Sequence, residues 1–290
     1  MTASVRKTIH HPDLRLERRV LQSYNERRLE SLPPQFAETL KAKKLVAVST
    51  GNQSLAKAIW CLESIGRSQD LFTEAFTDLS AGKFKSAWDK LEQCEIVLVH
   101  LKPHFTEVND RFGIRHMRSH IPKFQDLYPF TLGVSPAYLF REMRCSVCDA
   151  RIYLRNTCDH VVGEIYDGEM CARAITDVDI LEISLVDNPN QKYSVIFPNG
   201  DNDSRLSHLQ RVAEILESPW TAWSYEKEER KRKFGSDDGI TPTQPCPCGS
   251  SKSFQDCDCP KELTFPHFEI EVGDEARFDA WARKADPEQR

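Results

Sequence analysis

The sequence lacks the features of secreted and membrane-spanning proteins. None of its apolar runs approaches the ~20 residues that cross a bilayer, and Met1 to His11 contain no apolar stretch typical of a signal peptide. Hydrophobic residues make up 40% of the 290 positions and charged residues 29%, which is ordinary for a soluble protein with a buried core. We therefore expect neither a signal peptide nor a membrane-spanning helix.

The sequence also lacks an excess of positive charge and the common catalytic motifs. A net charge of −5 argues against a surface that is basic throughout, although a local patch for nucleic acid remains open. There is no P-loop, no Rossmann glycine pattern, no nucleophile elbow and no HExxH. These absences favour a non-enzymatic protein. The alternative is a hydrolase with an unrecognised site that uses His160, Glu164 or Glu182.

Cysteine, in contrast, is abundant. Of the 10 cysteines, all but Cys61 and Cys94 fall into two compact clusters, around 145–171 and 246–259. Without an export signal, closely spaced cysteines with a histidine nearby favour metal binding over disulfides. Cys61 and Cys94 lie on apolar helix faces and are predicted to be small buried side chains.

The first cluster contains the spacing of a zinc site. Cys145 and Cys148 form one pair and Cys158 and His160 a second, which supplies the four soft ligands of a tetrahedral zinc ion. We expect Cys145 and Cys148 on a tight turn whose amide groups point at the sulfurs, and a closed site that is structural. Cys171 follows an Asp-Gly hairpin turn. It competes with His160 as fourth ligand or lies beside the site as a fifth donor.

The second cluster contains Cys246, Cys248, Cys257 and Cys259. Its string C-P-C-G-S-x-K-x-F-x-x-C closely resembles the SEC-C motif, known from the C-terminal tail of the translocation ATPase SecA and from other bacterial proteins. The resemblance covers 245–259 and implies a second zinc ion, a bacterial or phage origin, and a knot that docks on a protein or a ribosome. Together with the reduced cysteines, it also implies a cytoplasmic location. In the family the fourth ligand directly follows the third, a place that Asp258 occupies here. We expect Cys259 to serve instead, because thiolate outcompetes carboxylate for zinc.

A shorter resemblance occurs at 181–190. This stretch is similar to a strand near the end of the catalytic domain of phage prohead proteases, and Glu182 matches the acidic position of that family. Those enzymes use a serine upstream of the strand and a histidine further upstream. No serine lies between His160 and Glu182, so we do not expect proteolysis.

Apolar periodicity predicts a helical N-terminal region. Helices are expected at 12–32, 35–48, 53–65 and 68–101, the last interrupted at Gly82, where the segment 79–87 resembles the turn of a tetratricopeptide repeat. A single α-helical hairpin within a bundle is favoured over a solenoid, because no second clear copy of the repeat occurs. His116 and His120 are interpreted as packing or surface residues.

The C-terminal half alternates strands and helices. We predict strands at 152–155, 193–197 and 265–272, a helix at 205–217, and a second helix capped by Asp274. The charged run 226–233 is interpreted as a helix end and 235–244 as a flexible linker. Trp220 and Trp223 are expected to anchor the preceding helix on the core.

These elements predict an α+β protein in four parts. They are a helical domain (1–103), a small zinc-bound β domain (104–200), a helix and linker (201–244), and the SEC-C motif with a strand-helix tail (245–290). The predicted function is that of a zinc-binding adaptor that docks on a protein or ribonucleoprotein partner. The alternative to an adaptor or a hydrolase is a nucleic-acid-binding zinc protein whose basic helix carries five arginines: Arg15, Arg18, Arg19, Arg27 and Arg28.

Overall fold

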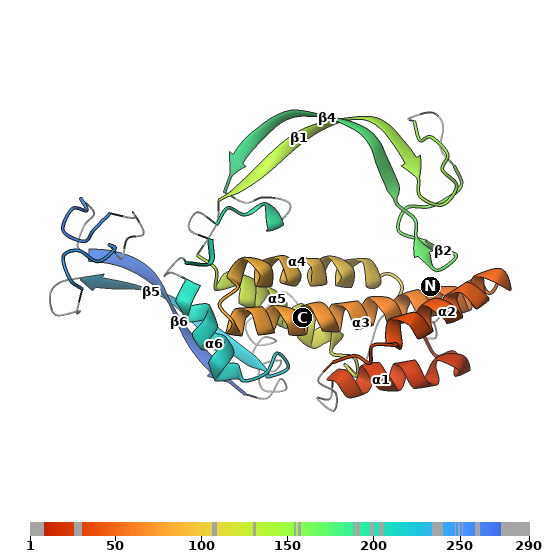
Figure 1. Cartoon of the computed structure of the whole chain (residues 1–290), viewed down its shortest axis with the longest axis horizontal. Helices are drawn as coiled ribbons and strands as arrows, with labels where there is room; N and C mark the ends of the chain where they lie inside the picture. Colours follow the sequence, from red (N-terminus) through yellow and green to blue (C-terminus); the bar gives the residue numbers. More distant parts are fainter. Residues whose placement is uncertain are drawn as a thin grey trace, which may run out of the picture.

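The protein consists of a helical body from which two long antiparallel ribbons extend (Figure 1). The computed structural model describes residues 9–25, 31–105, 109–129, 132–153, 155, 158–187, 189, 192–197, 200–202, 206–233, 240–246, 248, 250, 252–258 and 262–273. The predicted α+β class and the helical N-terminal region are confirmed. No described helix combines the length and the apolar character needed to cross a bilayer.

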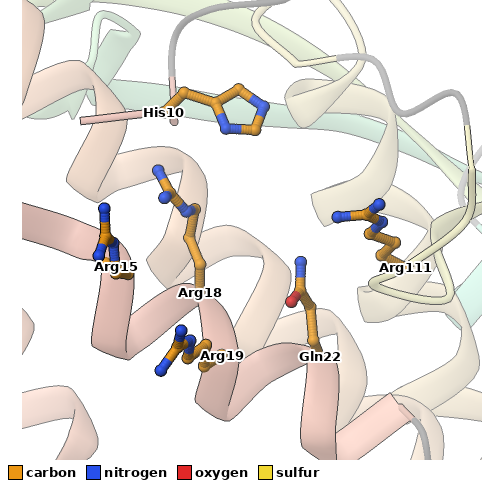
Figure 2. Close-up of a pocket in the computed structure, with 6 residues that line it drawn as sticks. All are labelled: His10, Arg15, Arg18, Arg19, Gln22 and Arg111. Carbon is orange, nitrogen blue, oxygen red and sulfur yellow. The ribbon is translucent and has the colours of Figure 1, made fainter. Parts of the chain in front are cut away.

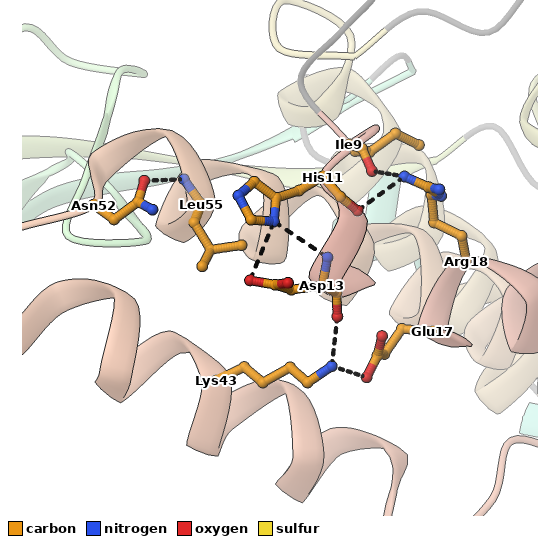
Figure 3. Close-up of polar contacts among 8 residues, drawn as sticks. All are labelled: Ile9, His11, Asp13, Glu17, Arg18, Lys43, Asn52 and Leu55. Atoms are coloured by element: carbon orange, nitrogen blue, oxygen red, sulfur yellow. Dashed lines mark hydrogen bonds and ion pairs between the residues drawn. The ribbon is translucent and has the colours of Figure 1, made fainter. Parts of the chain in front are cut away.

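The helical body contains six described helices. They are α1 (Arg15–Asn25), α2 (Phe36–Ser49), α3 (Gln53–Ser80), α4 (Phe84–Leu101), α5 (Ile114–Asp126) and α6 (Ser207–Leu216). A short 3₁₀ turn, Pro12–Leu14, leads into α1, and Figure 3 shows how Lys43 of α2 holds that region. Its ammonium donates to Glu17 Oε1 (2.5 Å) and to Asp13 O (2.6 Å). This pairing compensates part of the cost of burying Glu17, which is only 3% exposed and whose Oε2 has no hydrogen-bond partner among the described residues.

Helix α3 corrects the sequence prediction that a helix ends at Ile65. It runs without a break to Ser80, and Gly66 lies inside it. A Cβ atom at Gly66 would lie 3.3 Å from side-chain atoms of Leu21, Leu32 and Phe36. The glycine therefore allows close packing against α1 and α2 instead of ending the helix. The predicted hairpin is confirmed, because Gly82 turns the chain into α4 with a φ of +71°.

An aromatic core joins the helices to the C-terminal part of the chain. Trp223 is fully buried and its ring lies 5.1 Å from that of Phe124, while Trp220 lies 5.5 Å from Phe72. The tryptophans therefore anchor on the core, as predicted. His116 and His120 are buried on α5 with their rings stacked at 3.9 Å, which confirms the packing role.

The first ribbon pairs β1 (Gly133–Cys145) with β4 (Arg173–Val186) and arches over α4 (Figure 1). The sequence did not predict β1. Between the two strands lies a segment that we call the first tip (145–171), which contains the small hairpin of β2 (Ile165–Tyr166) and β3 (Glu169–Met170). The Asp167-Gly168 turn was predicted, and both residues have the positive φ it requires.

Two strands that were predicted near the first ribbon do not form regular strands in the described structure. Residues 193–197 are not a strand. They form the end of a 3₁₀ turn (Lys192–Ser194) and a single bridge from Val195 to Gly133, which closes the base of the arch. At 152–155 the described residues form no regular strand, although Arg151 bridges Arg144.

The second ribbon pairs β5 (Trp223–Lys233) with β6 (Glu262–Val272). The strand predicted at 265–272 is confirmed, but the charged run 226–233 is a strand and not a helix end. Its base is apolar and packs on the core through Tyr225, Phe268 and Ile270, whereas its charged outer half pairs with β6 in solvent. The helix predicted after Asp274 lies outside the described residues.

Candidate metal centres

The first tip brings four predicted ligands together. The ligand atoms of Cys145, Cys148, Cys158 and His160 all lie within 4.8 Å of one another. A tetrahedral site with Zn–S bonds of about 2.3 Å has ligand–ligand edges of about 3.8 Å. Small side-chain shifts therefore bring these four atoms to a shared ion, and the cluster is geometrically able to hold a metal.

The turn at Cys145 has the form expected of a metal knuckle. The amides of Cys148 and Val147 donate to the Cys145 sulfur, the latter at 3.4 Å. These hydrogen bonds lower the pKa of Cys145 to about 6. The thiolate that a metal requires is therefore favoured at this position before any ion binds.

His160 shows an unmet polar group inside the cluster. Its Nδ1 atom is buried and has no hydrogen-bond partner among the described residues. The ring lies edge-on to Tyr166 at 4.7 Å, which limits how it can turn. A buried ring nitrogen without a partner is costly in a metal-free protein, and coordination to an ion would remove that cost.

Cys171 lies directly beside the four. Its sulfur is 4.0 Å from that of Cys145, and burial raises its pKa. The set of mutually close ligand atoms includes His160 but not Cys171. Cys145, Ile152 and Cys171 form a small buried core of their own, separate from the core of the helical body.

The helical body holds the outer end of the first tip. Five hydrogen bonds connect the two among the described residues. Three involve backbone groups of the tip: His104 Nε2 with Gly163 O (2.7 Å), Asp167 N to Gln53 Oε1 (2.9 Å), and Lys44 Nζ to Gly168 O (3.1 Å). The other two join side chains, Lys44 to Glu169 and Gln53 to Asp167. The approach is close, because a Cβ atom at Gly168 would lie 2.7 Å from Lys44 Cδ. The arch is thus attached to the helices at its base and at its tip.

The second tip, which we define as 245–258, brings together three thiols. The sulfurs of Cys246, Cys248 and Cys257 lie within 4.8 Å of one another, and those of Cys248 and Cys257 are 3.4 Å apart. A hydrogen bond with Ser250 lowers the pKa of Cys248. The predicted fourth ligand, Cys259, lies outside the described residues. The competing Asp258 is exposed, with its carboxylate 3.1 Å from Lys252 Nζ.

The remaining predicted residues take no part in either cluster. Cys61 and Cys94 are buried in the helical body, as predicted, and burial raises the pKa of Cys61 to about 12. Glu164 lies 3.7 Å from Lys57, and Glu182 is exposed on β4 opposite Ala137. The described structure does not bring Glu182 into a cluster with His160.

Sequence reasoning missed an apolar face on the first ribbon. Four cross-strand pairs place apolar side chains on one face, which we call the apolar stripe: Val134–Leu185, Pro136–Ile183, Tyr138–Ile180 and Phe140–Val178. Leu181 is an extra residue at a bulge, and it shifts the register so that the stripe stays on one face. The sequence signal for this strand is the apolar residue at every second position across 134–140. Ala137 and Leu139 obscured that alternation because they are apolar as well.

The apolar stripe is exposed. Ile183 and Leu185 keep 66% and 67% of their surface in contact with solvent, and Tyr138 keeps 45%. The opposite face of the ribbon is mixed: Glu182 and Asp179 are polar, whereas Leu139, which pairs with Asp179, is apolar and 45% exposed. The continuous apolar row therefore lies on the stripe face, although neither face belongs to a larger sheet.

Comparison with known proteins identifies no relative. No family model matches the chain, and neither the curated proteins nor the solved structures contain a significant match.

Proposed function

We propose that the protein is a zinc-stabilised, non-enzymatic docking protein whose first ribbon binds a protein partner through the apolar stripe. The exposed stripe is the observation that carries the proposal. Monomeric proteins seldom leave a continuous row of large apolar side chains in water, and such rows mark interaction surfaces. A two-stranded ribbon is also marginally stable alone, and a partner that covers one face would stabilise it.

Zinc is the metal that the donor sets favour. Thiolate and imidazole ligands in a tetrahedral arrangement select zinc over magnesium or calcium, which prefer oxygen ligands. We assign Cys145, Cys148, Cys158 and His160 to the first ion, with Cys171 as an adjacent thiol. We assign Cys246, Cys248, Cys257 and Cys259 to the second. A set of four protein ligands leaves no open position for catalysis, which supports a structural role for both ions.

The first zinc ion would stabilise the ribbon at its outer end, in the first tip. The tip closes the turn between β1 and β4, and its contacts with the helices fix the far end of the arch. A ribbon that is fixed at both ends presents the stripe in one orientation. A rigid apolar surface binds with a smaller loss of conformational entropy than a mobile one.

The second tip supports the same proposal by its resemblance to the SEC-C motif. That resemblance implies a docking role in bacteria, on a protein or a ribosome, in the cytoplasm. We propose the second tip as an additional contact with the partner. Lys252 would supply a positive group there, and its exposed position beside Asp258 leaves it accessible.

The test is an affinity purification from a bacterial lysate with the full-length, zinc-loaded chain. The comparison includes wild type, Ile183→Glu in the stripe, and Thr264→Glu as a control, because Thr264 is an exposed strand position on the second ribbon. We expect one defined partner that wild type and Thr264→Glu retain and Ile183→Glu loses. A second sample with Cys246→Ser and Cys248→Ser tests the contribution of the second tip.

Two results would overturn the proposal. Retention of the same partners by Ile183→Glu would show that the stripe does not bind them. A homodimer in light scattering that Ile183→Glu converts to a monomer would assign the stripe to a second copy of the chain. Circular dichroism and zinc content should be unchanged in both glutamate variants, since both positions are exposed.

A further inference from the structure

A small pocket on the N-terminal side of the helical body is lined almost wholly by basic side chains. Its volume is about 200 Å³, and its lining residues, which we call the arginine pocket, are His10, Arg15, Arg18, Arg19, Gln22 and Arg111. None of them is acidic. Figure 2 shows that Arg18 and Gln22 rise from α1, that the Arg111 guanidinium points toward them from the segment before α5, and that His10 lies above.

The structure fixes Arg18 without neutralising its charge. Its Nη1 atom donates to two backbone carbonyls, Ile9 O at 2.6 Å and His11 O at 3.3 Å (Figure 3). Burial lowers the pKa of Arg18, and the charge of Arg15 lowers it further. Both effects mean that positive charge at this point is costly until an anion approaches.

The residues come from segments that are far apart in the sequence. Four of them share α1, while Arg111 lies more than eighty positions further along the chain. The convergence of guanidinium groups from two sides is the arrangement that surrounds a multivalent anion.

We propose that the arginine pocket binds a phosphate group. Guanidinium groups donate two parallel hydrogen bonds to phosphate oxygens, and several of them around one cavity match a dianion. The pocket is partly open to solvent, and its volume of about 200 Å³ leaves room for a single phosphate or a pyrophosphate. A nucleic-acid backbone is instead bound along a groove through successive phosphates. The ligand is therefore a free phosphate or the terminal phosphate of a small molecule.

Calorimetry with the full-length, zinc-loaded chain at 150 mM salt tests this assignment. The probes are inorganic phosphate, pyrophosphate and a nucleoside diphosphate, with sulfate as a competitor. The variants are Arg111→Gln and Arg15→Gln, which leave Arg18 and its backbone contacts intact. Arg211→Gln on α6 is the matched control, because it removes one exposed arginine outside the pocket.

We expect saturable binding of at least one phosphate probe, weakened about tenfold or more by each pocket variant and unchanged by Arg211→Gln. Preference for the nucleoside diphosphate over pyrophosphate would identify a ligand larger than the phosphate group. Arg111→Lys should bind more weakly than wild type, since lysine keeps the charge but not the paired donors. Absence of binding, equal weakening by all three glutamine variants, or equal affinity for sulfate and all phosphates would overturn the proposal. None of these results depends on the apolar stripe.

Discussion

The two ribbons end alike but differ in how they are attached and in what they expose. Each carries a cysteine cluster at its outer end, where the chain turns from one long strand to its partner. The first ribbon returns to the helices at its tip and exposes the apolar stripe. Among its described residues, the second ribbon packs on the core only through its base, and its outer half is charged.

A metal bound at the two tips would therefore serve two different purposes. In the first ribbon, the cluster lies in a segment that docks on α2 and α3, so an ion bound there would stabilise a contact between two parts of the molecule. In the second, hydrogen bonds within the segment, such as Cys246 N to Lys252 O at 2.8 Å, hold a small self-contained unit.

Metal removal should have the largest effect. Binding of structural zinc contributes about 10–16 kcal/mol to the folding of small zinc-binding segments. Chelation is therefore expected to unfold both tips. The helical core includes none of the candidate ligands, so α1 to α6 should remain folded. Limited proteolysis mapped by mass spectrometry should show new cuts within 145–171 and 245–258 with little change in helical circular dichroism. Loss of the helical signal together with the metal would contradict this separation.

Substitution of single ligands should distinguish His160 from Cys171. We expect His160→Asn to weaken zinc binding at the first tip by more than the roughly 10–100-fold seen for outer partners of a metal site. Cys171→Ser should weaken it by less, because the Cys171 sulfur lies outside the set of four mutually close ligand atoms. Competition with a chromophoric chelator measures both affinities, with the second tip as an internal reference. The reverse order would assign Cys171 as the fourth ligand.

The base of the first ribbon should be sensitive to pH through Glu92. This carboxyl is buried on α4 beside the backbone of Lys192, and burial raises its pKa from 4.5 to about 7 despite the charge of Lys192. A raised pKa in the folded state means that this group favours folding below pH 4.5 and that the advantage is lost as pH rises through 7. Glu92→Gln should thus raise the melting temperature at pH 8 and leave it nearly unchanged at pH 4.5. Equal effects at both pH values would exclude Glu92 as the source.

The contacts that dock the first tip should have the smallest effect. Gln53→Ala removes two exposed hydrogen bonds with Asp167, each worth about 1 kcal/mol: the one that Gln53 Oε1 accepts from the Asp167 amide and the one that Gln53 Nε2 donates to the Asp167 carboxylate. Amide exchange within 161–171 should accelerate several-fold, while exchange within 245–258 should not change. Thr77→Ala on the same helix serves as a control, because its hydroxyl bonds only within α3. Acceleration at both tips would indicate a general loss of stability.

The sequence predicted the clusters better than the ribbons that carry them. Ligand spacing is a local property, so Cys145 to His160 could be recognised within sixteen positions. Strand pairing is not local: β1 contains Pro136, which cannot donate to a ladder but is tolerated at an edge. Its partner begins only at Arg173. The run 226–233 resembled a helix end because its charges carry no period of two, and pairing with the distant β6 decides its conformation.

The arginine pocket also depends on contacts between segments that are distant in the sequence. The arginines of α1 and the acidic Glu17 among them are visible in the sequence as a helix of mixed charge. Glu17 in fact points to Lys43 on another side of α1, and Arg111 joins the cluster only through the fold. No spacing rule connects Arg111 to α1.

Native mass spectrometry of the full-length chain tests the central claim most directly, namely that each ribbon ends in a zinc-binding tip. We predict two zinc ions for the wild type, one for the variant with Cys145→Ser and Cys148→Ser, and one for the variant with Cys246→Ser and Cys248→Ser. A wild-type mass without bound metal, or two ions retained in either double variant, would contradict the account.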